Sequence, residues 1–258
     1  MSEAGRLVNV FVDPKPAFAD IAARPRWWVP MVLVTVCFLA HMLAFSSHVG
    51  WERFMRQQLE SSPKGQSMSP EDRERALEMQ VKFGAPIGTF IAVAAQPVVM
   101  LVTAGVLMFI FTNMLGAVVK FPQALAVAAY ASLPGVLALA GGVLVMFLKD
   151  PTDFDLKNPA GYNLGFYLDP HAVPAWLVSL GTSIDVFSFW IILLLATGMA
   201  AVTRKRWTTA LTGVLIPWGV VVVGKVAWAA IFVGSSLCGS SQIRRSRSRI
   251  LASRRSSR

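Results

Sequence analysis

The 258-residue chain contains little charge and almost no cysteine. Only 15% of its residues are Asp, Glu, Lys or Arg, against roughly 25% in soluble domains, and 55% are hydrophobic. Two cysteines, Cys37 and Cys238, are too few for a disulfide framework, and no CxxC pattern suggests a structural metal. A chain with this much apolar surface is neither disordered nor an ordinary soluble domain. The composition therefore indicates a membrane protein.

The sequence also lacks the common catalytic and cofactor-binding motifs. It has no GxGxxG, P-loop or HExxH pattern, and its three histidines have no partner at the spacing of metal ligands. Ser61 and Lys64 match SxxK, but the companion motifs of that chemistry are missing. We therefore expect a protein that is not an enzyme and that uses no cofactor or metal.

Long uncharged runs occupy most of the chain. A hydrocarbon core about 30 Å thick is crossed by a helix of around 20 apolar residues. Three runs contain no charged residue, one contains only Asp185 and one contains only Lys225. We predict an all-α membrane protein with five transmembrane helices at roughly 27–46, 86–115, 122–148, 175–202 and 207–235.

Proline interrupts three of the expected spans, at Pro97, Pro134 and Pro217. Neighbouring helices and side-chain hydroxyls satisfy the carbonyls that proline leaves free in a bilayer, so we expect kinks. The alternative is a helix broken around a substrate site, as in transporters.

The predicted organisation has three parts. Residues 1–26 form two short amphipathic pieces, whose apolar faces we expect to lie in lipid, making an interfacial N-terminal segment. Residues 27–235 form the membrane domain, and residues 236–258 a disordered Ser/Arg-rich tail. In the polar stretch between the first two spans, Ser69 before Pro70 predicts the start of a helix near 70–83 that continues into span two. The aromatic residues expected at the headgroups are Trp27, Trp28 and Trp207.

Short basic connections predict the orientation in the membrane. Lys120 lies between spans two and three, and Arg204, Lys205 and Arg206 lie between spans four and five. Lys and Arg in short loops favour the cytoplasmic side. The N-terminus is therefore expected in the cytoplasm, and the acidic connection 149–174 on the other side.

Two further sets of residues are predicted to hold the spans together. Small residues let helix backbones approach closely. Asp185 and Lys225 are each about ten residues from the outer ends of the expected spans four and five, hence level with each other. We expect them to form an intramembrane ion pair that fixes the register of the two spans, with a proton or ion relay as the alternative. The glycines expected at helix contacts are Gly84, Gly88, Gly135, Gly142 and Gly198.

Three stretches resemble the bacterial members of the Yip1-domain family. They are "RLVNVFVDPKPAFADIAARPRWWVPMVL" at the start, "NPAGYNLGFYL" before span four, and "SIDVFSFWIILLLATGMAAVTRKRWTTAL" in and after span four. The resemblance covers roughly residues 6–235 and implies five helical spans with a cytoplasmic N-terminus. Eukaryotic relatives act in vesicle traffic and bind Rab GTPases. Their long N-terminal region has no counterpart here, so Rab binding is not expected.

The net charge of +10 is mostly a property of the tail. Seven of the 24 Lys and Arg lie in the last 15 residues, and without them 17 basic residues face 14 acids, a balance of +3. The tail is interpreted as an extension that touches anionic headgroups, as a nucleic-acid arm, or as a stretch translated in a shifted frame, and nucleic acid is the least favoured partner.

The sequence leaves two functions open. The first is a non-enzymatic scaffold in the bacterial inner membrane that acts through helix contacts with other membrane proteins or with itself. The second is a small transporter or channel that uses the Pro-broken spans and the Asp185–Lys225 pair. No small-molecule substrate is identifiable.

Overall fold

The computed structural model describes residues 1–150, 160–169 and 172–233, which belong to two compact units. The first unit contains Met1–Ala160 and Trp190–Val214, and the second contains Gly161–Phe189 and the chain from Leu215 onward. The expected tail, 236–258, lies outside the described residues.

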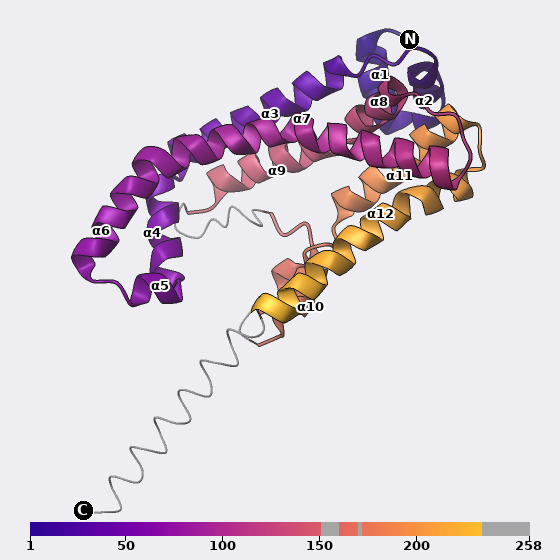
Figure 1. Cartoon of the computed structure of the whole chain (residues 1–258). Helices are drawn as coiled ribbons and strands as arrows, with labels where there is room; N and C mark the ends of the chain where they lie inside the picture. The colour runs from indigo at the N-terminus through magenta and orange to yellow at the C-terminus, as the bar shows by residue number, and fades with distance from the viewer. Residues whose placement is uncertain (151–159, 170–171, 234–258) are drawn as a thin grey trace, which may run out of the picture. The chain divides into compact units, whose positions relative to one another are not determined.

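The first unit consists of helices and short π-helical turns (Figure 1). Its complete α-helices are α1 (Glu3–Val12), α2 (Pro14–Ala23), α3 (Trp28–His48), α4 (Trp51–Ser61), α5 (Pro63–Gln66), α6 (Pro70–Met79), α7 (Ala85–Phe109), α8 (Phe121–Ala131) and α9 (Pro134–Leu148). The π-helical turns are η1 (Gln80–Gly84) and η2 (Ile110–Met114).

Three long helices of this unit, α3, α7 and α9, run side by side (Figure 1). At one end, α1 and α2 pack on α8; at the other, α4, α5 and α6 form a small helical group. Ser69 begins α6 as predicted, because its hydroxyl accepts a hydrogen bond from the backbone N–H of Asp72 at 3.1 Å. From there the chain continues through η1 into α7, so the polar helix feeds directly into the second span as expected.

Five helical segments are long and apolar enough to cross a membrane, which confirms the predicted fold class. They are Trp28–His48, Pro70–Met114, Phe121–Leu148, Val186–Thr203 and Trp207–Ile231. Helices α7 and α12 (Trp207–Trp228) continue through Pro97 and Pro217 without a break. The third span does break, into α8 and α9, at a turn immediately before Pro134.

The fourth span begins later than predicted. Residues 175–181 form a separate short helix, α10 (Ala175–Gly181), and α11 (Val186–Thr203) begins only after a turn. The expected continuous run 175–202 is therefore wrong in its first third. The turn is held locally, because the hydroxyls of Thr182 and Ser183 both donate to the Ser179 carbonyl at 2.9 Å.

The second unit contains the turns and helix ends around α10. Its elements are the 3-10 helix η3 (Leu164–Tyr167), α10, the start of α11, the end of α12 and the π-helical turn η4 (Ala229–Val233). Gly165 and Gly181 allow η3 and α10 to touch, because a Cβ at Gly181 would lie 2.9 Å from the Gly165 nitrogen. The backbone N–H of Leu164 also donates to the Ile184 carbonyl at 3.1 Å, which fixes the turn before α11.

Candidate functional site

The apolar faces of α1 and α2 are covered by protein and not by lipid. Val10, Phe18 and Ile21 are each 0% exposed, and the two helices pack on each other and on α8. Phe11 meets Trp190 of α11 edge to face, with ring centroids 5.7 Å apart. The expectation of an apolar face inserted in lipid is therefore corrected, although both helices form where the pattern placed them.

A charged cluster ties this helical hairpin together. The Arg6 side chain is 1% exposed, and its guanidinium donates to Asp20 Oδ2 at 2.7 Å and to Glu3 Oε1 at 3.1 Å. It also donates to the Arg24 carbonyl at 3.1 Å. Hydrogen bonds from Arg24 and then Arg6 hold the pKa of the Asp20 carboxyl well below its usual range. The hairpin is thus closed by charge-assisted hydrogen bonds around one buried guanidinium.

Two side chains of the third span connect this cluster to the membrane helices. The Tyr130 hydroxyl, on the fully buried side of α8, donates to Glu3 Oε2 at 2.7 Å. Gln123 Nε2 donates to the Ala22 carbonyl at 3.0 Å. We call Glu3, Arg6, Asp20, Arg24 and Tyr130 the N-terminal charge cluster. It is an anchor, because the contacts of Arg6 with Asp20 and of Tyr130 with Glu3 hold one helix to another.

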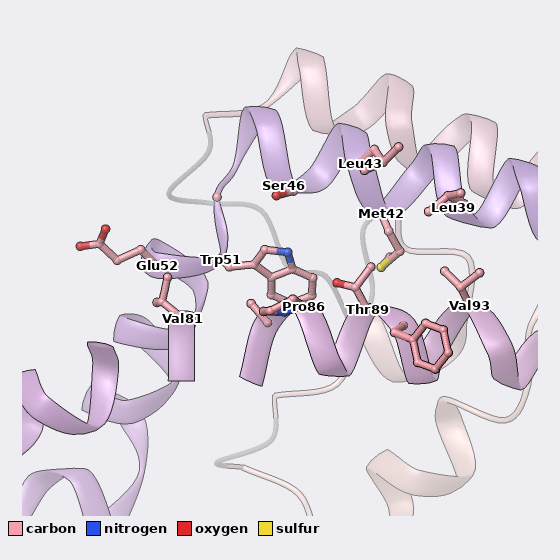
Figure 2. A pocket seen from close by; sticks show the side chains of 13 residues that line it. Leu39, Met42, Leu43, Ser46, Trp51, Glu52, Val81, Pro86, Thr89 and Val93 are labelled. Atoms are coloured by element: carbon pink, nitrogen blue, oxygen red, sulfur yellow. The ribbon is translucent and has the colours of Figure 1, made fainter. Parts of the chain in front are cut away.

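An apolar groove of about 760 Å³ lies between the first two spans, at the end of the unit away from this cluster. Met42 on α3 points toward Thr89 on α7, Val93 lies further along α7, and Trp51 lies at the other end (Figure 2). Leu43 on α3 also lines the groove. Its remaining lining residues are Leu39, Ser46, Gly50, Glu52, Val81, Ala85, Pro86 and Phe90. The hydropathy of the two spans did not predict this groove, because both spans are apolar all round and the groove depends on how they pack with α4.

Two hydroxyl groups line the groove. The hydroxyls of Ser46 and Thr89 have no hydrogen-bond partner within the described residues. A hydroxyl without a partner at the edge of the hydrocarbon is unfavourable, and a hydrogen bond to a neighbouring helix removes that cost.

The predicted Asp185–Lys225 ion pair is absent from the ion pairs of the described residues. Asp185 immediately precedes α11, and its Oδ1 accepts a hydrogen bond from the Ser188 backbone N–H at 2.8 Å. Lys225 Nζ instead donates to Thr182 Oγ1 at 3.0 Å and Ser183 Oγ at 3.1 Å. The expectation failed because it placed Asp185 ten residues inside a span that in fact begins at Val186.

The basic residues expected at one face lie in short connections. Lys120 precedes α8, and its backbone N–H donates to Gln123 Oε1 at 3.2 Å. Arg204, Lys205 and Arg206 form the whole turn between α11 and α12, with Arg204 in the left-handed region at φ 54°. Arg204 and Arg206 are exposed. These positions suit charges that face water or headgroups.

The aromatic residues expected at headgroups occupy helix starts. Trp27 and Trp28 open α3 and are 37% and 56% exposed, and Trp207 opens α12 at 40% exposure. The Trp207 indole N–H donates to Thr197 Oγ1 at 3.2 Å, which ties the two ends of the basic turn together.

The glycines expected at helix contacts fall into two groups. A Cβ at Gly88 or Gly135 would meet no atom within 4 Å, and at Gly84 the nearest atom is 3.9 Å away, so these three do not bring helices together in this chain. Gly142 is buried on α9. Gly198 is the tight contact, because its Cβ would lie 2.5 Å from Val127 Cγ1. Gly213, which the pattern missed, is similar: its Cβ would lie 2.8 Å from Phe111.

Comparison with known proteins agrees with this architecture. No curated protein and no solved structure matches the chain. The model of the Yip1 domain matches residues 8–231, which spans α1 to the end of the fifth membrane helix and covers most of the chain. The protein is therefore a multi-pass membrane protein that belongs to the Yip1-domain family.

Proposed function

We propose that this Yip1-domain protein is a non-enzymatic scaffold that binds a transmembrane helix of another membrane protein in the groove between α3 and α7. We further propose the bacterial inner membrane as its location, with the N-terminus in the cytoplasm, from the basic turns at Lys120 and Arg204–Arg206. The groove carries the proposal, because the Ser46 and Thr89 hydroxyls that line it have no hydrogen-bond partner among the described residues.

The position of the groove along the membrane normal favours a helix as its occupant. Ser46 lies eighteen residues after Trp28, which at 1.5 Å per residue is about 27 Å along α3, near the far edge of a hydrocarbon core of about 30 Å. Leu39 lies deeper, and Trp51 and Glu52 lie beyond that edge. An acyl chain ends at its headgroup, whereas a transmembrane helix continues past the interface and fills the whole length.

The lining also suits helix packing. Ser46 and Thr89 are small, so a partner backbone can come close to them, and small residues with hydroxyls are enriched at contacts between membrane helices. Each hydrogen bond from these hydroxyls across the interface contributes about 0.6–2 kcal/mol. Leu43 and Phe90, which are 59% and 74% exposed, supply apolar contact at the rims.

Photo-crosslinking in native membranes tests the proposal. A crosslinker at Leu43 or Phe90 should capture one discrete protein, whereas the exposed positions Val36 and Val99 outside the groove should not. Thr89→Phe should abolish the crosslink by filling the groove. Thr103→Phe, on the same helix outside the groove, should leave it unchanged.

Other results would overturn the scaffold. Crosslinks to lipid alone, or to all four positions alike, would mean that the groove binds no partner helix. Crosslinks between copies of this chain would make the partner a second copy. Solute flux by the purified protein in vesicles, lost in Thr89→Phe, would favour a transporter or channel instead.

A further inference from the structure

Lys225 carries a cation on an exposed face of the fifth span. It is an exposed residue of α12, and its ammonium is held by the Thr182 and Ser183 hydroxyl oxygens at 3.0 and 3.1 Å. Because those two hydroxyls direct their protons at the Ser179 carbonyl, both present lone pairs to the ammonium. Two of its three N–H groups are thereby used, and no other acceptor among the described residues takes the third.

The turn that holds the ammonium is packed against neighbouring elements. Ser183 is buried at 9% exposure, and α10 is pressed on η3 at Gly165 and Gly181. The Ser179 hydroxyl donates to the backbone carbonyl of Lys225 at 3.4 Å, which ties α10 to α12 at the same level. These contacts position the ammonium beside α10.

The depth of Lys225 identifies what lies beside it. It is eighteen residues after Trp207, which at 1.5 Å per residue is about 27 Å, close to the far edge of a hydrocarbon core of about 30 Å. Trp228, one turn further and 63% exposed, and Trp176 on α10, 42% exposed, are the aromatic residues expected at that interface. A lysine there extends its ammonium toward the headgroups.

We propose that Lys225, positioned by Thr182 and Ser183, binds the phosphate of an anionic phospholipid in the leaflet opposite the N-terminus. The third N–H donates to a phosphate oxygen in a charge-assisted hydrogen bond. The acyl chains then lie along the apolar exposed face of α12 that includes Val220, Val221 and Val223. The site shares no residue with the groove between α3 and α7, so the two proposals are tested independently.

Native mass spectrometry of the full chain in detergent, titrated with phosphatidylglycerol, tests this site. Lys225→Gln should weaken the tightest lipid-binding event at least tenfold, and Lys225→Arg should restore most of it. Lys205→Gln removes the same charge from the turn at the other end of α12, so it should leave that event unchanged. Phosphatidylcholine and inorganic phosphate are expected to compete poorly, because the first has no net charge and the second gains no contact with the helix.

The double variant Thr182→Val/Ser183→Ala keeps every charge and is expected to bind phosphatidylglycerol three- to tenfold more weakly. If Lys225→Gln does not fold, the lipid titration of this double variant tests the proposal instead. An unchanged dissociation constant in whichever of these variants folds would overturn the proposal. So would equal competition by inorganic phosphate, which would indicate a free-anion site, or retention of a protein partner at Lys225 in place of lipid.

Discussion

Replacing Arg6 by Met should release the α1–α2 hairpin from the membrane helices. The change keeps most of the apolar stem but removes a guanidinium that binds Asp20, Glu3 and the Arg24 carbonyl. Loss of one member of a fully buried ion pair costs about 3–5 kcal/mol, and loss of an exposed pair about 0–1. Arg6 is 1% exposed, but its partners Asp20 and Glu3 are 17% and 25% exposed, so we expect about 2–3 kcal/mol.

Amide hydrogen exchange of α1 and α2, measured in nanodiscs, reports this local opening. A loss of about 2–3 kcal/mol corresponds to exchange faster by roughly 30- to 150-fold. Arg26→Met is the matched control, because Arg26 also contacts Glu3, at 3.4 Å, but is 62% exposed. Arg26→Met should accelerate exchange of α1 and α2 by less than about fivefold, since exposed pairs contribute under about 1 kcal/mol.

The exchange rates of the two variants show whether burial of Arg6 determines the strength of the cluster. If Arg6→Met and Arg26→Met accelerate exchange equally, burial does not determine the strength of the cluster. If Arg6→Met leaves exchange within about threefold of the wild type, the hairpin is held by its apolar face alone, through Val10, Phe18 and Ile21. Tyr130→Phe removes the hydrogen bond to Glu3 and should lower the free energy of opening of the hairpin by about 1–2 kcal/mol.

Three further predictions concern pH, packing and topology. Because the folded pKa of Asp20 is depressed, its stabilisation is complete above the unfolded value of about 3.9 and is lost as the pH falls toward the folded value. The exchange protection factors of α1 and α2, which divide out the pH dependence of the intrinsic amide exchange rate, should therefore fall below about pH 4 in the wild type and much less in Asp20→Asn. Gly198→Ala should lower unfolding stability in detergent by about 1–3 kcal/mol, because its Cβ would lie 2.5 Å from Val127; Gly88→Ala, in open space, should be neutral or gain up to about 1 kcal/mol, and similar losses in both would show that packing is not the cause. Reporter fusions after residues 65, 118, 160 and 205 should alternate outside, inside, outside, inside, and a cytoplasmic signal at 160 would contradict five crossings.

The number of spans was predictable from the sequence because it depends on length and hydropathy alone. Where the fourth span begins was not, because residues 175–202 read as one apolar run with no proline to end it. The break at 182–185 comes from hydroxyls that bond the Ser179 carbonyl and from the approach of Gly181 to Gly165. These contacts depend on a segment sixteen residues away, which a hydropathy window does not include.

The sequence pattern also could not predict whether an apolar helix face contacts lipid or another helix. The periodicity of α1 and α2 correctly predicts which residues share a face, but lipid tails and the side of α8 are equally apolar. Arg6 gave the only available hint, since a cation on the covered side of a helix needs a carboxylate, and Glu3 stands at the i, i+3 spacing. Glycine spacing failed for the same reason, because the pattern at Gly84 and Gly88 does not say which neighbour, if any, the face meets.

Polar groups determine what such a protein binds, because apolar surface does not distinguish a partner helix from lipid in a membrane. The donors and acceptors of the N-terminal charge cluster bind one another, so few of them can bind a ligand. Ser46, Thr89 and the third N–H of Lys225 differ, because within the described residues they have no acceptor or donor of their own. A ligand that satisfies the two hydroxyls must present backbone or side-chain polar groups along a helix, whereas one that satisfies the ammonium must carry negative charge at headgroup depth. The two proposed ligands, a partner helix and an anionic phospholipid, thus differ in class because the groups proposed to bind them differ in chemistry.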